Sequence, residues 1–250
     1  MLILLPPSET KHPGGVRRVL DLDTMAFPEL RPQREAVVDA LVALSADENE
    51  AARVLKLSER QRPEIAANAR LREAPTMPAV DRYTGVLFDA LDASSLDAAS
   101  RRWLGAHVLI HSAPFGPVGA LDRIPAYRLA ANTALPGVPP LTRQWAGAVT
   151  AALAAASPPF VLDLRSEAYA ALGPVPADMP TRYVRVVAEG PDGSARALNH
   201  FNKHAKGAFV RALAESRPRA STAVGLLRWA EAAGFVLREG DAPGELDLVV

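Results

Sequence analysis

The segment from Asn199 to Gly207 contains the residues best suited to bind an anion. Lys203 and Lys206 lie three positions apart, so they share one face if the segment is helical. The start of a helix offers free backbone N–H groups and the positive end of the dipole, and both attract anions. Lysines at that end disfavour the helix itself, which indicates a functional reason for them. Solvated surface lysines are the alternative explanation.

Phe201 stands between two amide side chains in the same segment, Asn199 and Asn202. An aromatic ring can stack on a nucleobase while neighbouring amides hydrogen-bond to its edge, as single-strand and flipped-base sites require. A place for Phe201 in the hydrophobic core is equally compatible with the sequence.

Three apolar stretches, which we interpret as strands, each run into a serine. These are Leu2–Leu5 before Ser8, His107–Ile110 before Ser112, and Phe160–Leu164 before Ser166. Ligands of open parallel sheets bind outside the carboxyl ends of the strands, so we expect nearby hydroxyls and cations to converge on one rim suited to a phosphate or carboxylate. The expected rim comprises Ser8, Thr10, Lys11, Ser112, Arg165 and Ser166. Serines that only open turns or cap helices are the alternative.

Aromatic and cationic residues are adjacent at three places in the chain. The pairs are Arg82-Tyr83, Tyr127-Arg128 and Arg182-Tyr183. Tyrosine and arginine together can stack on bases and hold phosphates. The first two pairs lie in expected loops and are candidates for such a role, whereas the third is expected on the surface of a hairpin.

Several common catalytic and nucleotide-binding motifs are absent. Ser8-Glu9-Thr10-Lys11 lacks the glycine spacing of a phosphate loop, and the chain has no Gly-x-Gly-x-x-Gly and no Gly-x-Ser-x-Gly. The absence of cysteine excludes thiolate metal sites and disulfides. We therefore expect no cofactor.

The five histidines do not indicate a metal site. His107 and His111 are expected on one strand, where four residues span roughly 13 Å. His200 and His204 have a chelating spacing near a helix start, but the intervening residues lack a zincin glutamate, and the neighbouring lysines would repel a cation. We therefore predict no metal.

The bulk composition describes a globular protein without a strong charge. The 250 residues are 49% hydrophobic and 22% charged, and 28 basic residues balance 28 acidic ones. Typical nucleic-acid binders are basic overall, so any phosphate site must be a local patch. The apolar start of the chain stops at Pro6-Pro7 without a basic flank, unlike a signal peptide, and no apolar run reaches the roughly 18–20 residues of a membrane span. We expect a soluble, cytoplasmic monomer that does not engage a membrane.

Hydrophobic periodicity and turn residues predict a mixed sheet surrounded by helices, in one α/β (mixed α+β) domain over residues 1–250. A hairpin is expected around Pro191-Asp192-Gly193. The expected helices are Pro28–Leu44, Ala51–Leu57, a third after Ser58, Tyr83–Leu91, Leu141–Ala156, Asn202–Glu215 and Ala223–Ala233. The expected strands are Leu2–Leu5, Val108–Ile110, Phe160–Leu164, Tyr183–Ala188, Ala195–Asn199, Phe235–Arg238 and Leu246–Val249.

Six of these segments occur in the order and approximate spacing of the YaaA-type peroxide stress resistance proteins, and the chain resembles that family over nearly its whole length. The segments are Met1–Lys11, Arg82–Gly85, Ser112–Gly116, Ile124–Leu129, Leu162–Tyr169 and Asn199–Gly207. The resemblance implies a single cytoplasmic domain with the mixed architecture called a cantaloupe fold. It also implies resistance to hydrogen peroxide through limitation of free intracellular iron, and DNA binding as reported for the archetype.

The resemblance further implies a shared polar cleft. The family's positions fall here on Ser8, Thr10, Lys11, Tyr83, Gly85, Tyr127, Arg128, Ser166, Tyr169, Lys203, Lys206 and Gly207. The chain departs from the archetype in being less basic in its C-terminal half. It also lacks a glycine hairpin near Leu55–Ala69, where the helix-hairpin-helix suggested for the family would fall. Both departures weigh against strong duplex binding and leave the cleft intact.

Three functions remain open from the sequence. The first is a peroxide (oxidative) stress protein that binds DNA or another phosphate-bearing ligand in the cleft and limits free iron. The second is an enzyme acting on a small nucleotide, nucleobase or other phosphorylated ligand in the same cleft, and direct iron handling is the third. The predicted binding residues are Ser8, Thr10, Lys11, Arg82, Tyr83, Tyr127, Arg128, Ser166, Tyr169, Asn199, Lys203 and Lys206.

Overall fold

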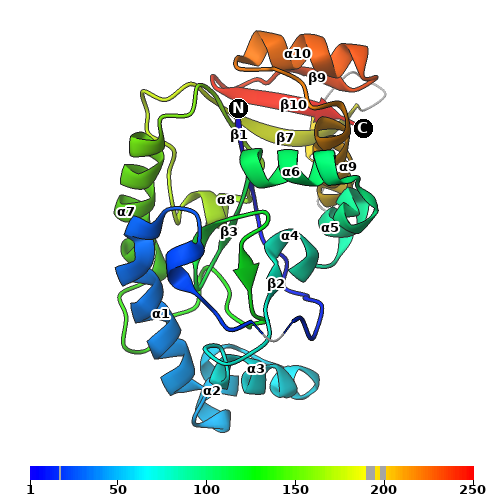
Figure 1. Cartoon of the computed structure of the whole chain (residues 1–250). Coiled ribbons are helices and arrows are strands. Elements are labelled where there is room, and N and C mark those ends of the chain that lie inside the picture. The colour runs from blue at the N-terminus through cyan, green and yellow to red at the C-terminus, as the bar shows by residue number, and fades with distance from the viewer. Residues whose placement is uncertain (17, 190–194, 198–200) are drawn as a thin grey trace.

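The computed structural model describes residues 1–16, 18–189, 195–197 and 201–250, and it centres on one mixed sheet (Figure 1). The strand order is β4-β3-β1-β6-β7-β10-β9, with β8 paired to β7. The bounds are β1 Leu2–Leu5, β3 Val108–Ser112, β4 Gly116–Gly119, β6 Val161–Asp163, β7 Thr181–Glu189, β8 Ala195–Ala197, β9 Val236–Glu239 and β10 Glu245–Val249. The mixed α/β fold class is confirmed.

Strand β1 is a central strand that pairs in parallel with β3 on one side and β6 on the other. Leu4 faces Leu109 in one register and Asp163 in the other. Continuous apolar runs such as Leu2–Leu5 are typical of strands covered on both faces. The three strands predicted to run into serines are therefore parallel neighbours, and their carboxyl ends meet at one edge of the sheet.

Helices flank the sheet on both sides, with α1 and α7 on one side and α5 and α9 on the other (Figure 1). Val37, Val38 and Leu41 of α1 are fully buried at the predicted helical spacing. The longer helices are α1 Arg31–Leu44, α6 Ala98–His107, α7 Leu141–Ala156, α9 Phe201–Ser216 and α10 Ala223–Ala232. The shorter ones are α2 Glu48–Val54, α3 Ile65–Ala69, α4 Ala79–Arg82, α5 Val86–Leu91 and α8 Glu167–Ala170. A small second sheet pairs β2 Met77–Pro78 with β5 Arg123–Ile124.

Two helix starts differ from the prediction for local reasons. The helix expected from Tyr83 begins at Val86, because Tyr83 is extended and Gly85 has a positive φ of 94°. Ser58 caps a 3-10 helix, Glu59–Glu64, through a capping box with Gln61, so the α-helix starts seven residues after it.

The region before β3 also differs from the prediction. His107 ends helix α6 and is not part of the strand, which contradicts its expected place beside His111 on a strand. Helix α6 was not predicted, although Asp97 caps it by accepting from the backbone N–H of Ser100 at 2.6 Å.

The hairpin prediction is confirmed in its pairing. Strands β7 and β8 are antiparallel, with Val187 opposite Ala197. The Pro191-Asp192-Gly193 turn lies outside the described residues. None of the helices in the described part of the chain is long and apolar enough to cross a bilayer.

A fully buried arginine joins the chain segments beside the parallel strands. Arg82 donates to the backbone carbonyls of His12, Gly14 (2.9 Å), Pro75 (3.0 Å) and Ile124 (3.2 Å). The carbonyls come from the loop after β1, the segment before β2, and β5. The guanidinium therefore fixes the loop that follows β1.

Replacing Arg82 with methionine leaves these carbonyls without their donor. Each lost bond to a charged group is worth about 1 kcal/mol or more, so we expect the free energy of unfolding to fall by about 3 kcal/mol. Urea unfolding followed by circular dichroism measures it. Arg102→Met, at an exposed position of the same chain, is the control and should change stability little. Equal losses in the two variants would contradict this role of Arg82.

Candidate functional site

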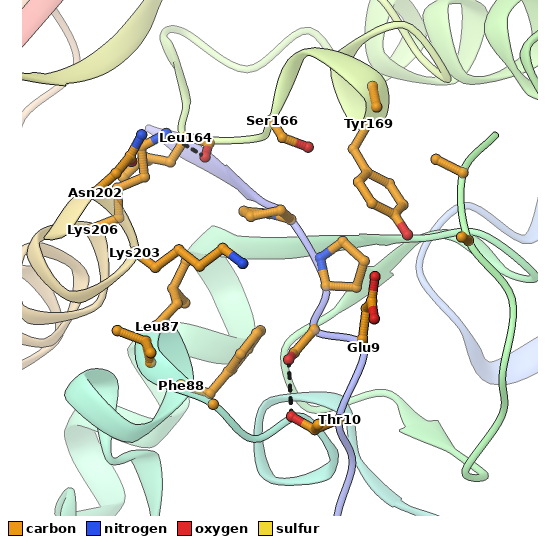
Figure 2. A pocket seen from close by; sticks show the side chains of 18 of the residues that line it. Glu9, Thr10, Leu87, Phe88, Leu164, Ser166, Tyr169, Asn202, Lys203 and Lys206 are labelled. Atoms are coloured by element: carbon orange, nitrogen blue, oxygen red, sulfur yellow. Dashed lines mark hydrogen bonds between the residues drawn. The ribbon is translucent and has the colours of Figure 1, made fainter. Parts of the chain in front are cut away.

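A cavity of about 790 Å³ opens at the carboxyl ends of β1 and β6, beside the starts of α5, α8 and α9 (Figure 2). Its wall also includes the segment that follows Tyr127. The polar lining residues are Ser8, Glu9, Thr10, Lys11, Thr84, Arg128, Asn132, Ser166, Glu167, Tyr169, Tyr183, Asn202, Lys203 and Lys206. The edge of the sheet predicted from the three strands thus carries a sizeable cavity.

Two hydroxyls from the loop after β1 line the floor of the cavity. The Oγ atoms of Ser8 and Thr10 are 3.3 Å apart, and Thr10 donates to the carbonyl of Thr84 at 3.3 Å. A Cβ at Gly85 would lie 3.3 Å from each of these hydroxyl oxygens. Glycine at this position therefore leaves the space in which the two hydroxyls sit, and its positive φ suits no other residue as well.

Lys11 belongs to the same loop, and its amine contacts the protein on several sides. Its Nζ donates to the carbonyls of Ser8 (3.0 Å) and Glu9 (3.1 Å) and lies 4.1 Å from the ring centre of Tyr127. Burial, followed by the nearby charge of Arg128, lowers the pKa of Lys11 to about 7. The carbonyls and the ring face favour the ammonium form.

The rings of two tyrosines, Tyr83 and Tyr127, lie against the amine of Lys11. The hydroxyls of Tyr83 and Tyr127 are 2.7 Å apart, and both residues are buried. Burial raises the pKa of Tyr127 well above its usual value, so the phenol stays neutral. Both residues were predicted to contact a ligand, but the structure places them under Lys11 and outside the lining of the cavity.

Lys206 enters the opposite wall from helix α9. Its Nζ donates to the carbonyl of Leu164 at 3.0 Å and lies 5.8 Å from the ring centre of Tyr183. Burial lowers the pKa of Lys206 to about 8, while the charge of Asp163 opposes the shift. Lys203, one turn earlier, is exposed, and its side chain points into the cavity (Figure 2).

Gly207 sets the depth at which α9 lies. A Cβ at this position would lie 2.1 Å from the carbonyl oxygen of Leu87 in α5, which is too close for a non-bonded contact. Helices α5 and α9 can therefore contact each other backbone to backbone only because residue 207 is glycine. This contact carries Lys206 to the end of β6.

Arg128 closes the cavity between two carboxylates. Its guanidinium lies 3.2 Å from Glu9 and 3.5 Å from Glu64. The buried Asn68 of α3 holds the backbone of Arg128, accepting from its N–H at 2.7 Å and donating to its carbonyl at 2.9 Å. The α3 region thus positions a cation of the cavity.

Ser166 and Tyr169 line a further wall through α8. Ser166 precedes the first residue of this short helix in extended conformation, and Tyr169 is half-buried. The hydroxyl of Tyr169 and the carboxylate of Glu9 point toward the same part of the cavity (Figure 2). Burial raises the pKa of Tyr169, so this hydroxyl can donate a hydrogen bond.

The structure brings together eight of the predicted binding residues, which all line the cavity: Ser8, Thr10, Lys11, Arg128, Ser166, Tyr169, Lys203 and Lys206. Arg82 does not line it, because its guanidinium is committed to backbone carbonyls. Asn199 lies outside the described residues.

The expected rim is wrong for Ser112 and Arg165. Ser112 is fully buried and accepts from the backbone N–H of Phe115 at 3.0 Å. Arg165 turns inward, where it pairs with Asp163 at 2.7 Å and contacts His111 at 2.9 Å. Alternate side chains of an extended segment point to opposite faces, so a residue at the end of a strand can face the protein interior and not the cavity.

Sequence reasoning missed several polar residues of the lining. Glu9 and Glu167 are adjacent in the sequence to the predicted residues Ser8 and Ser166. This adjacency was the only feature of the sequence that could have indicated them. Tyr183 was expected on a hairpin surface, which is wrong: β7 lies between β6 and β10, and the Tyr183 hydroxyl donates to the carbonyl of Arg165 at 2.9 Å. Among the described residues, no three histidine, aspartate or glutamate side chains gather as metal ligands.

The chain is thus an α/β protein with a mixed sheet and a cavity at the edge of its parallel strands, lined by cationic and hydroxyl side chains. Comparison with known proteins gives the family. The chain matches the family described as Peroxide stress protein YaaA over residues 1–240, and it belongs to that family. It is 46% identical to a UPF0246 protein of Corynebacterium efficiens over the full length of both chains. It is also 43% identical to a UPF0246 protein of Streptomyces coelicolor over 85% of this chain and 82% of that one.

The lowered pKa of Lys206 predicts a pH-dependent stability. The unfolded chain binds the proton up to about pH 10.4, whereas the folded protein releases it near pH 8. Unfolding therefore takes up a proton between these values, so stability rises with pH across this window relative to a variant without the amine. Below pH 8 the cost of the buried charge is present in full.

Lys206→Met should thus be more stable than the parent at pH 7, and the difference should shrink by up to about 3 kcal/mol by pH 10. Urea unfolding at pH 7, 8, 9 and 10 measures the two curves. Lys203→Met is the matched control from the exposed position of the same helix. A constant difference between parent and Lys206→Met across this range would contradict the shift.

Proposed function

We propose that this member of the peroxide stress family binds a phosphate-bearing ligand in the cavity and acts through it in the response to peroxide. The observation that carries the proposal is the lining itself. Four cationic side chains, Lys11, Arg128, Lys203 and Lys206, share it with two carboxylates. Hydroxyls of Ser8, Thr10 and Ser166 supply further hydrogen bonds to phosphate oxygens.

The size of the cavity favours a confined ligand. About 790 Å³ is within the range of sites for small molecules and cofactors. The formal net charge of the chain is zero, so the long-range attraction that assists duplex DNA binders is weak here. We therefore favour a nucleotide, free or as one unit of a nucleic acid, over a long stretch of duplex.

If the ligand is a macromolecule, we propose that it is DNA. The affinity for duplex DNA would depend steeply on salt concentration. The logarithm of the binding constant falls by about 0.9 per log unit of salt for each phosphate contacted. Titration of duplex, bulged and single-stranded oligonucleotides at several salt concentrations distinguishes the forms. Binding of a mononucleotide with a shallow salt slope and no binding of oligonucleotides would assign the cavity to a small ligand.

An enzymatic role is the second candidate. It is favoured by two amines whose pKa values burial lowers to about 7 for Lys11 and about 8 for Lys206. Groups that titrate near neutral pH are suited to proton transfer. Turnover of a bound nucleotide or phosphorylated compound, followed by mass spectrometry, tests this role.

Limitation of free intracellular iron is a further part of the proposal, and it rests only on the resemblance of the sequence motifs. Calorimetric titration with ferrous iron under anaerobic conditions tests a direct contribution. A saturable site would make the protein an iron binder, while its absence would leave an indirect effect through the phosphate ligand.

Removing the exposed cation of the cavity should weaken phosphate binding. Lys203→Met loses a charge-assisted hydrogen bond, which is worth about 1.5 kcal/mol, so we expect about tenfold weaker binding of a nucleoside monophosphate. Calorimetry measures the affinity. Arg228→Met, at an exposed position outside the cavity, is the charge-matched control. An equal loss in both variants would show that the effect comes from net charge alone.

Phosphate binding should also weaken as pH rises from 7 to 9. Lys11 and Lys206 lose their protons near pH 7 and 8 in the free protein, and a phosphodiester keeps its charge throughout this range. The bound anion favours the protonated amines, so binding takes up protons and is strongest at the acidic end. Calorimetry with a dinucleotide in buffers of different ionisation enthalpy measures this uptake. A pH-independent affinity would contradict it.

A further inference from the structure

The amine of Lys206 is buried without a carboxylate partner. The residue is 5% exposed, and in the described part of the chain the hydrogen-bond acceptor of its Nζ is the carbonyl of Leu164. Asp163 is near, but Arg165 holds both its carboxylate oxygens, at 2.9 and 2.7 Å. A buried lysine with a purely structural role is ordinarily paired. Burial without a carboxylate partner makes the amine of Lys206 easier to deprotonate than that of an exposed lysine.

Lys11 offers an informative contrast in the same cavity. Two of the directions around its Nζ are taken by the carbonyls of Ser8 and Glu9, and the third faces the ring of Tyr127. That arrangement commits the nitrogen of Lys11 to its own loop and to the ring. The Nζ of Lys206 donates to one carbonyl and lies 5.8 Å from the ring centre of Tyr183, whereas the Nζ of Lys11 donates to two carbonyls. Lys206 therefore has fewer hydrogen-bond acceptors, and its nitrogen is less committed to the protein.

The surroundings of Lys206 suit a substrate with a phosphate group. Lys203 and Asn202 lie beside it on α9, and Ser166 lines the same cavity from α8 (Figure 2). A phosphate bound by these groups would place a neighbouring carbon atom near the amine. A neutral amine in such a site is a nucleophile toward carbonyl carbon.

We propose that Lys206 forms a Schiff base with an aldehyde carried next to a phosphate group. This inference rests on the proposed phosphate binding and adds covalent chemistry to it. The nitrogen lone pair attacks the aldehyde carbon, and the carbonyl oxygen takes up a proton to give a carbinolamine. Loss of that oxygen as water leaves a protonated imine. Hydrolysis reverses both steps and returns the amine, so no oxidant or reductant is consumed.

Two sources provide this chemistry. One is a small phosphorylated aldehyde, and the other is the ring-opened sugar of an abasic nucleotide, whose aldehyde lies beside phosphodiesters in DNA. Both present an aldehyde a few bonds from a phosphate, and both fit the chemical character of the lining.

Reductive trapping tests the proposal on the full chain. The protein is incubated with glyceraldehyde 3-phosphate, or with an oligonucleotide containing one abasic site, in the presence of cyanoborohydride. We expect one saturable adduct with the mass of the aldehyde less one oxygen atom, located at Lys206 by peptide mapping of the unsubstituted protein. Trapping should increase from pH 6 to 8 as the amine loses its proton. The arm that gives the adduct identifies the source.

Three variants sharpen the result. Lys206→Arg keeps the positive charge but cannot form an imine, so the adduct should be lost while the thermal transition shows that the protein is folded. Lys203→Met should retain the adduct at Lys206 but require a higher aldehyde concentration. Arg228→Met should behave as the parent. Labelling of several lysines in proportion to their exposure, or no adduct in either arm, would overturn the proposal.

Binding of unreactive analogues separates this inference from the proposed function. Glycerol 3-phosphate and an oligonucleotide with a tetrahydrofuran abasic analogue carry the phosphates without the aldehyde. If either binds in the cavity and no adduct forms, the Schiff base is refuted and phosphate binding stands. If neither binds and no adduct forms, both are refuted.

Discussion

The cavity depends on the hydrogen bonds of one buried arginine. The loop after β1 carries Ser8, Thr10 and Lys11, but it makes few strand contacts of its own. Arg82 holds this loop by donating to the carbonyls of His12 and Gly14, and it ties the same loop to the segments before β2 and in β5. Without this guanidinium, the backbone carbonyls that it binds in three segments would lose that donor. An arginine that looks like a ligand contact in the sequence therefore serves as the internal brace of the site.

Desolvation gives the cavity its chemical character. Lys11 and Lys206 are both removed from water, and burial is the largest cause of the lowered pKa of each. Their surroundings differ, because Lys11 sits between two carbonyls and a ring face while Lys206 has a single acceptor. One cavity thus contains two amines with lowered pKa values, of which Lys206 has fewer hydrogen-bond acceptors. An anionic ligand would find both beside the hydroxyls of the parallel strands.

Much of the architecture could be predicted from local pattern. Continuous apolar runs identified β1, β3 and β6, and the Ala-rich helix Leu141–Ala156 has the predicted bounds. Helix α6 was missed although it has ten residues and a cap at Asp97. The β2–β5 sheet was missed because strands of two residues carry no periodicity. The rim was predicted correctly for Ser8 and Ser166. It was wrong for Arg165, whose side chain turns inward to Asp163.

The sequence pattern predicts which residues can meet, since three apolar strands that end in polar segments must present those segments at one edge once they pair in parallel. Which of these residues face the cavity depends on how the chain packs in three dimensions. Tyr83 and Tyr127 became the support of Lys11, and Tyr183 moved from an expected surface to the cavity wall. Side-chain direction, burial and the close approach of α9 to α5 at Gly207 depend on long-range packing. Local spacing along the chain carries no information about that packing.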